Sequence, residues 1–270
     1  MQTLIAAAAR LGLSLDASQQ ALFRRYYELL EEGGQTANLT GAKGWERVRE
    51  ELFLRSQRVL SPAAGGYGPA AGWFRPPAGP GWGTPPGQDA QVRRILDVGT
   101  GAGVPGLVLK IAMPHIQVTL LDAAEKKCEF LRRAVRVLGL TGAEVLQARA
   151  EEAAHSPAHR EAYDLVVARA LARLAELAEL TLPFVKVGGV VIAQKGQGVE
   201  AELSEAGFAA RELGAAPAIT EAVSSPGSAP PDTLVYWLKI SGTPAKYPRR
   251  TGTPHKRPLA EAVRTAGATA

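Results

Sequence analysis

The residues of this chain that could do chemistry begin with an acid followed by alternating glycines. The run Leu-Asp-Val-Gly-Thr-Gly-Ala-Gly at 96–103 places Asp97 before Gly99, Gly101 and Gly103. Glycine lets the backbone turn sharply and lets a ligand approach without a Cβ atom in the way. In an open α/β sheet, ligands bind beyond the carboxyl ends of the strands, where the strand order reverses. We therefore predict a ligand site at this turn.

A second acid, Asp122, ends the next expected strand and indicates a nucleoside ligand. Its carboxylate could accept both ribose hydroxyls, or it could serve only as the N-cap of the following helix. Residues 101–106 also fit the dinucleotide fingerprint GxGxxG, which expects an acid about 20 residues later. Asp97 favours S-adenosylmethionine, because an acid before the first glycine attracts a sulfonium and an amino group but repels a pyrophosphate. A nicotinamide-dependent oxidoreductase is the alternative.

Three other charged residues follow expected strands. Glu151 could contact an adenine or be a surface acid, whereas Arg169 and Lys195 could position a substrate or be solvated. The single cysteine, Cys128, lies within an expected helix and is interpreted as a packing residue. The four histidines show no ligand spacing beyond one His-x3-His pair interrupted by Pro157, so we predict no metal site.

The elements that must position these residues alternate between strand and helix from residue 93 onward. Strands are expected at 94–98, 116–121, 145–146, 163–168, 189–194, 208–213 and 233–240. Helices are expected at 107–112, 123–138, 170–185 and 200–206. Near-continuous apolar strands separated by helices imply a mostly parallel sheet that is covered on both faces. The expected fold is thus a doubly wound α/β sheet of seven strands.

Composition changes divide the chain into four segments. Residues 1–60 are expected to form an N-terminal helical region in which Gly33 and Gly34 separate two groups of helical spacing. Residues 61–91 contain seven Pro and eight Gly and are expected to be an insertion or linker, or else an aromatic arm that docks or stacks on RNA bases. Residues 92–240 form the ligand-binding core, and 241–270 a basic, Pro-rich tail.

Charge and cysteine usage restrict the partners and the compartment. The 270-residue chain has a net charge of +5, which favours an anionic partner without requiring one. One cysteine allows no intrachain disulfide, and no run of 18 apolar residues occurs, so we expect a cytoplasmic protein that does not span a membrane. The tail is expected to be an extended arm that neutralises phosphates, or else merely a solvated tail. Its candidate RNA-binding residues are Lys246, Arg249, Arg250, Lys256 and Arg257.

The motifs together resemble a known family. The run at 95–106, Ile-Leu-Asp-Val-Gly-Thr-Gly-Ala-Gly-Val-Pro-Gly, is similar to the signature of the bacterial 16S rRNA guanine-N7 methyltransferases, also called glucose-inhibited division protein B. Further matches fall in order at 38–40, 120–131, 149–152, 168–170, 195–197 and 247–256. The resemblance covers most of the chain outside 61–91. It implies a Rossmann-like class I methyltransferase fold and N7-methylation of a guanine in 16S rRNA or the small ribosomal subunit, by a monomer.

The resemblance also implies how the site works. S-adenosylmethionine would contact the turn after the first strand and the residues that follow the next three strands. The resemblance implies such contacts at Gly99, Val104, Asp122, Ala150, Glu151 and Arg169, and the glycine-turn motif itself adds Asp97, Gly101 and Gly103 as cofactor-binding residues. Guanine N7 carries a lone pair, so we expect no obligatory general base and catalysis by alignment, with Arg169 or Lys195 placing the substrate.

Two departures from the family pattern leave a further alternative open. Gly33 and Gly34 stand where the family usually has Trp-Asn, and the segment from Leu52 to Arg55 replaces its usual His-x-x-Asp. These changes affect substrate placement more than cofactor binding. A non-catalytic RNA-binding or ribosome assembly factor with the same fold is therefore the alternative to an enzyme.

Overall fold

The computed structural model describes residues 1–10, 13–37, 39–60, 94–196, 198–223 and 231–260. The predictions for residues 61–91, Asn38, Gln197 and 261–270 therefore lie outside the described residues.

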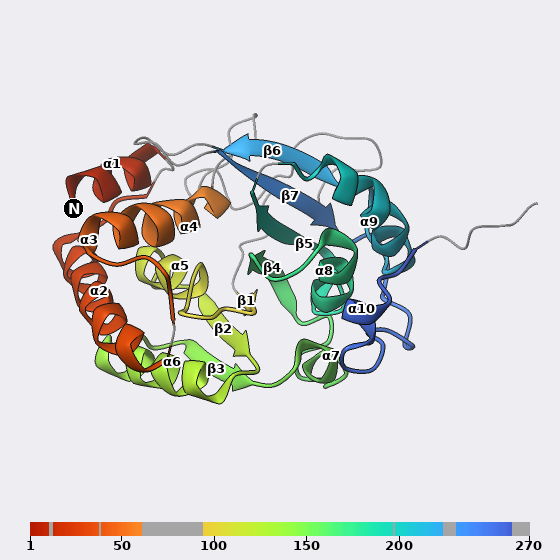
Figure 1. The fold of residues 1–270 in the computed structure, drawn as a ribbon, viewed down its shortest axis with the longest axis horizontal. Helices are drawn as coiled ribbons and strands as arrows, with labels where there is room; N and C mark the ends of the chain where they lie inside the picture. Colours follow the sequence, from red (N-terminus) through yellow and green to blue (C-terminus); the bar gives the residue numbers. More distant parts are fainter. Residues whose placement is uncertain (11–12, 38, 61–93, 197, 224–230, 261–270) are drawn as a thin grey trace, which may run out of the picture.

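The centre of the molecule is one seven-stranded sheet (Figure 1). Its strands are β1 (Arg94–Val98), β2 (Gln117–Asp122), β3 (Ala143–Gln147), β4 (Tyr163–Arg169), β5 (Val185–Lys195), β6 (Ile219–Val223) and β7 (Asp232–Leu238). The order is β3-β2-β1-β4-β5-β7-β6, with β1 to β5 parallel and β7 antiparallel to both of its neighbours. This confirms the predicted Rossmann-like class I methyltransferase fold with a doubly wound, mostly parallel sheet. The winding reverses between β1 and β4, so their carboxyl ends border the crevice where such sheets bind ligands.

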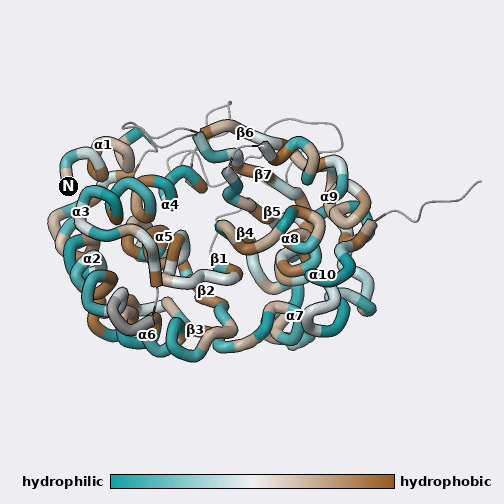
Figure 2. Tube along the Cα trace, in the orientation of Figure 1, coloured by the Kyte–Doolittle hydropathy of each residue, from teal (hydrophilic) through white to brown (hydrophobic). Residues whose placement is uncertain are grey.

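Helices cover both faces of the sheet, as the strand pattern predicted. One face carries α5 (Gly106–Ala112) and α6 (Glu125–Val137), and the other carries α7 (Ala150–Ala153), α8 (Leu174–Thr181) and α9 (Glu200–Glu212). Each face has its own apolar cluster, because successive strand residues point to opposite sides. Figure 2 shows helices whose turns alternate between hydrophobic and hydrophilic residues, as expected for helices with one buried side.

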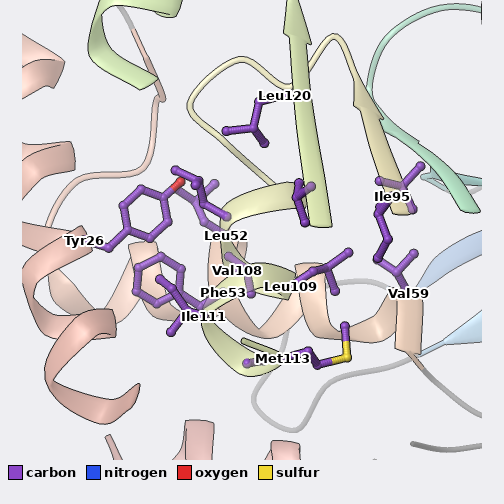
Figure 3. Packing of buried hydrophobic residues seen from close by; sticks show 14 of the residues in the cluster. Tyr26, Leu52, Phe53, Val59, Ile95, Val108, Leu109, Ile111, Met113 and Leu120 are labelled. Carbon is purple, nitrogen blue, oxygen red and sulfur yellow. The ribbon is translucent and has the colours of Figure 1, made fainter. Parts of the chain in front are cut away.

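The N-terminal helical region packs over α5 and α6. Its elements are α1 (Gln2–Arg10), α2 (Ala17–Ala37), α3 (Trp45–Arg47), the π-helical turn η1 (Val48–Leu54), α4 (Arg55–Gln57) and the 3₁₀ turn η2 (Arg58–Leu60). Apolar residues from this region, including Tyr26, Leu52 and Phe53, form one cluster with residues of α5 and β1 (Figure 3). The region is therefore built into the same core as the sheet.

Two predicted elements in the second half of the chain were wrong. The strand expected at 208–213 is the end of helix α9, and the sixth strand is instead β6. The buried positions of α9 follow helical spacing: Ala206, Ala209 and Ala210. The helix expected at 170–185 is only α8, because Ala170 has a positive φ of 49° and Pro183 cannot continue a helix.

The predicted break at Gly33 and Gly34 was also wrong, because α2 runs through both glycines. A Cβ atom on Gly33 would lie 2.7 Å from Leu39 Cδ1 and 2.7 Å from a ring carbon of Phe130, whereas one on Gly34 would meet nothing within 4 Å. Gly33 therefore lets α2 approach α6 closely, and tertiary packing outweighs the poor helix propensity of glycine.

The described part of the tail is not the extended arm that its prolines predicted. Residues 241–260 pack against the face of the sheet covered by α7 and α8 and include the short helix α10 (Thr253–Lys256). Tyr247 and Leu259 are buried in the apolar cluster of that face. The tail is thus held by apolar anchors as well as by the polar contacts described below.

Candidate functional site

The glycine turn that we predicted to bind a ligand lies at the carboxyl end of β1. Hydrogen bonds to Asp97 hold it in place. This carboxylate is fully buried, and its Oδ2 atom accepts hydrogen bonds from Thr100 Oγ1 at 2.6 Å and from the Gly106 amide at 2.7 Å. The bonds join the beginning of the turn to the first residue of α5. Burial raises the pKa of Asp97 to about 6, although the two hydrogen bonds and Arg169 act in the opposite direction.

The three glycines of the turn have the conformation that the sequence predicted. Gly99, Gly101 and Gly103 have φ values of 68°, 58° and 95°, which side chains with a Cβ rarely adopt. A Cβ atom on Gly101 would have no neighbour closer than the Gly99 carbonyl oxygen at 3.9 Å, so the backbone there faces open space. The turn therefore leaves room for a ligand next to its backbone.

Asp122 lies beside the turn at the carboxyl end of β2. Its Oδ2 atom accepts a hydrogen bond from the Gly101 amide at 2.9 Å, and its Oδ1 atom accepts one from the Ala124 amide at 2.9 Å. Asp122 therefore shapes both the glycine turn and the start of the following helical segment. The N-cap alternative was wrong, because the N-cap residue of α6 is Ala124 and no side chain caps that helix.

Arg169 ends β4, directly across the switch point. Its side chain is largely buried, and burial lowers the pKa of its guanidinium, with Arg55 acting in the same direction while Asp232 and Asp97 oppose it. Its Nη1 atom is buried without a hydrogen-bond partner among the described residues, and so is Asp97 Oδ1. Buried polar atoms nearly always have partners, so these two mark a place for a polar ligand.

Lys195 does not join this group. In the register of the sheet Arg169 pairs with Gln194, so Lys195, the next residue, points to the opposite face. Its ammonium group donates to the Ala172 carbonyl at 2.9 Å and lies 3.0 Å from Glu202. Of the two candidates for placing the substrate, Arg169 is the one beside the glycine turn.

Glu151 lies at the start of α7, after β3, as expected. Its side chain accepts a hydrogen bond from the Gly252 amide at 2.8 Å, and Glu152 accepts one from Thr251 at 3.0 Å. The tail therefore contacts the segment that contains the predicted adenine contacts. No sequence pattern indicated this contact, because 101 residues separate Glu151 from Gly252.

The predicted RNA-binding residues of the tail fall into two groups. Arg249 is bonded to the fully buried Glu179 through its amide, Nε and Nη2 atoms, and Lys246 pairs with Glu212 at 3.0 Å. The side chains of three others are exposed and form no ion pair within the described part of the chain: Arg250, Lys256 and Arg257. Arg249 thus stabilises the docked tail, and the exposed three remain available to a partner.

A buried charge network was not predicted at all. Asp232, at the start of β7, forms ion pairs with Arg55 and Arg58 and accepts a hydrogen bond from Gln194 at 2.8 Å. Arg55 is one of the departures from the family pattern, and the structure gives it a buried partner. No local motif could have indicated this, since 177 residues separate Arg55 from Asp232.

Tyr26 was also missed as a residue of the site. It belongs to the apolar stripe of α2, but its hydroxyl donates a hydrogen bond to the carbonyl of Ala102, within the glycine turn, at 2.6 Å. In the sequence, Tyr26 recurs with Leu22, Leu29 and Leu30 at helical spacing, which could not show what its hydroxyl would reach.

Cys128 is buried, as predicted, and its thiol lies 3.2 Å from the Asp122 carbonyl oxygen. Across the described ranges, no cluster of three His, Cys, Asp or Glu side chains could hold a metal ion. Among the same residues, no helix combines the length and apolar character that crossing a bilayer requires.

These residues fit the cofactor that the sequence implied. The open backbone at Gly101, the acid that ends β2 and the unpartnered oxygen of Asp97 together offer space and acceptors to a nucleoside with cationic groups. The site lies at the switch point between β1 and β4, where the fold binds ligands.

The chain is similar to proteins of one known family. Residues 86–226 match a family model named GidB and described as rRNA small subunit methyltransferase G. Relatives that carry the name Ribosomal RNA small subunit methyltransferase G occur in Dehalococcoides mccartyi (39% identity; 96% of this chain and 100% of the relative) and Lactiplantibacillus plantarum (39%; 94% and 95%). Among solved structures, a predicted O-methyltransferase from Agrobacterium tumefaciens overlaps 55% of this chain and 74% of its own, with 22% identity and a TM-score of 0.46.

Proposed function

Because the chain belongs to the GidB family of rRNA small subunit methyltransferases, we propose that it transfers a methyl group from S-adenosylmethionine to N7 of a specific guanine in 16S rRNA. The observation that carries this proposal is the glycine turn that follows Asp97 at the switch point of the sheet and lies beside Asp122 and Arg169. Near-full-length similarity to the relatives supports it.

Residues at the ends of four strands would hold the cofactor. Asp122 offers a carboxylate to the ribose, Ala150 and Glu151 lie where the adenine is expected, and the backbone at Gly101 leaves room for the remainder. Gly99 is also proposed as a contact, through its backbone, although Leu171 fills the space where its side chain would be. The other contacts proposed on the turn and on β4 are Asp97, Gly103, Val104 and Arg169. When bound, S-adenosylmethionine supplies an electrophilic methyl group.

The chain's own part in catalysis is to position the substrate. Guanine N7 is nucleophilic without losing a proton, so no side chain has to act as a general base, and alignment supplies the rate enhancement. Arg169 is the best-placed cation, because its guanidinium is held beside the turn and could donate to the guanine O6 or to a phosphate. Lys195 is a weaker candidate, because its ammonium is paired with Glu202 on the other face.

The exposed side chains of Arg250, Lys256 and Arg257 are the part of the tail that we propose to contact RNA phosphates. A cavity of about 510 Å³ between α7 and the tail adjoins Arg250 and is lined by charges of both signs. We further propose that the protein acts in the cytoplasm as a monomer on 16S rRNA or the small subunit.

The departure at Arg55 does not by itself favour a non-catalytic assembly factor. Arg55 is paired with Asp232, so its charge has a structural explanation that leaves the glycine turn intact.

Methyl transfer to under-modified small subunits tests the proposal. Subunits from a strain lacking the gene should accept one labelled methyl group, recovered as 7-methylguanosine, and Arg169→Ala should reduce the rate at least tenfold. Arg173→Ala is a matched control, because Arg173 is exposed and paired with Glu205. Subunit binding without turnover would favour the assembly factor, and thermal stabilisation by NAD(P) but not by S-adenosylhomocysteine would favour an oxidoreductase.

A further inference from the structure

We propose that Tyr26 is a positioning residue for the cofactor, through which helix α2 holds the glycine turn in its binding conformation. The inference rests on the proposed function for the identity of the ligand. The contact itself is a property of the protein without ligand. The proposal gives the N-terminal helical region a role in cofactor affinity. This region lies outside residues 86–226, the part of the chain that the family model matches.

The contact is a hydrogen bond between two distant parts of the chain. Tyr26 is fully buried, and its hydroxyl donates to the Ala102 carbonyl at 2.6 Å, across 76 residues of sequence. Burial and the nearby Asp97 raise the pKa of Tyr26, so the phenol stays protonated and remains a donor. A buried hydroxyl without a partner is costly, so this bond is strongly favoured once the ring is in place.

The bond acts on the most conformationally permissive part of the site. Ala102 stands between Gly101 and Gly103, both of which have positive φ values. Glycine loses more conformational freedom on ordering than any other residue, so this turn needs external restraints. Asp97 and Asp122 supply restraints from the sheet, and Tyr26 supplies one from helix α2.

The fit around the hydroxyl is close. A Cβ atom on Gly103 would lie 2.9 Å from the Tyr26 oxygen, so a glycine at 103 is what allows the phenol to approach. The turn and the tyrosine therefore fit each other, and a ligand that binds the turn would meet a backbone already fixed by α2.

Tyr26 is itself held rigidly. Its ring stacks on Phe53 of η1, with centroids 5.4 Å apart and planes 20° apart. Figure 3 shows the two rings side by side, with the Tyr26 hydroxyl directed away from the helix that carries it. One end of α2 is anchored as well, because Gln19 Nε2 donates to the carbonyls of Ile111 and Ala112 at the end of α5. Helix α2 thus contacts both the last turn of α5 and the glycine turn that precedes α5.

The substitution Tyr26→Phe tests the role, because it removes one oxygen and keeps the ring. Tyr163→Phe is a matched control: Tyr163 is also buried, and its hydroxyl bonds His159 and Thr119, but it lies at the amino ends of the strands. We expect Tyr26→Phe to raise the dissociation constant of S-adenosylhomocysteine, measured by calorimetry, about five- to tenfold, as befits one lost hydrogen bond. The KM for S-adenosylmethionine should rise by a similar factor with kcat nearly unchanged, and Tyr163→Phe should leave both constants as they are.

Amide hydrogen exchange in the ligand-free protein gives a second readout. The amides of Gly101, Gly103 and Val104 all donate hydrogen bonds within the site and should exchange faster in Tyr26→Phe, while those of β4 keep their wild-type rates. Global destabilisation would instead accelerate both segments. Wild-type affinity together with wild-type exchange at the turn in Tyr26→Phe would overturn the inference. If the wild-type protein does not bind S-adenosylhomocysteine, the proposed function fails, and the exchange experiment still decides whether Tyr26 restrains the turn.

Discussion

Arg249 in the tail and Glu179 in α8 form a paired contact in which the carboxylate is fully buried. The guanidinium lies 2.9 Å from Oε1 through Nε and 2.6 Å from Oε2 through Nη2, and the Arg249 amide also donates to Oε1 at 2.7 Å. This pair explains why a segment rich in proline and basic residues is docked on the protein. It also separates the structural role of one tail cation from the binding role proposed for its neighbours.

We predict that Arg249→Ala lowers the free energy of unfolding by about 3 kcal/mol, because it leaves the Glu179 carboxylate buried without its counter-charge. Arg250→Ala is the control one residue away, and its exposed side chain should contribute less than about 0.5 kcal/mol. Chemical denaturation of the two variants measures the difference. Equal stabilities would mean that the pair does not hold the tail in solution.

The exposed cations of the tail should behave in the opposite way. We predict that replacing Arg250, Lys256 and Arg257 together by alanine leaves the unfolding free energy nearly unchanged and weakens binding to small-subunit rRNA. On single-stranded RNA, each phosphate contact contributes about −0.7 to the slope of the logarithm of the binding constant against the logarithm of the salt concentration. The slope of the triple variant should therefore be less steep than that of the wild type by about 2. Filter binding across a salt series provides the slopes. A triple variant with the wild-type slope would remove these residues from the RNA interface.

The sequence was sufficient for the features that depend on neighbouring residues. The glycine turn, the acid that ends β2 and the alternation of strands and helices are local patterns, and the structure has them where they were expected. The errors lie where a local pattern is ambiguous. Residues 208–213 are apolar enough for a strand, but they end α9, because its alanines are buried at helical spacing.

The rest of the site depends on contacts between distant residues, which no local pattern contains. Tyr26 and Ala102 are 76 residues apart, and Arg55 and Asp232 are 177 apart. A hydroxyl in an apolar helical stripe, or an arginine in a helix, has many possible partners until the fold brings one of them near. Docking of the tail by Arg249 is of the same kind, since in the sequence Glu179 is simply one acid of an expected helix.

Asp97 should make stability depend on pH in a characteristic direction. Its folded-state pKa of about 6 lies above the ordinary value of 3.8 for an aspartate, so the folded protein binds the proton more tightly than the unfolded chain does. Stability is therefore greatest at low pH with respect to this group, falls as the pH rises from about 4 to about 6, and is constant above that. Asp97→Asn cannot ionise, so the wild-type unfolding free energy should fall relative to the variant by roughly 3 kcal/mol over this range. Denaturation curves of both proteins at several pH values check this, and parallel curves would contradict it.

The two adjacent glycines of α2 provide a last comparison within one helix. Gly34 is exposed, and a Cβ atom there would have no neighbour within 4 Å, so Gly34→Ala should stabilise the protein by about 0.5–1 kcal/mol through helix propensity. Gly33→Ala gains the same propensity, but its methyl group would lie 2.7 Å from Leu39 and Phe130 and force α2 away from α6. We predict a net destabilisation of about 1–3 kcal/mol, as is typical of overpacking. Thermal unfolding of both variants measures the difference. If Gly33→Ala is as stable as Gly34→Ala, α2 does not pack on α6 as closely as the structure has it. The proposal that α2 holds the glycine turn in place would then lose part of its support.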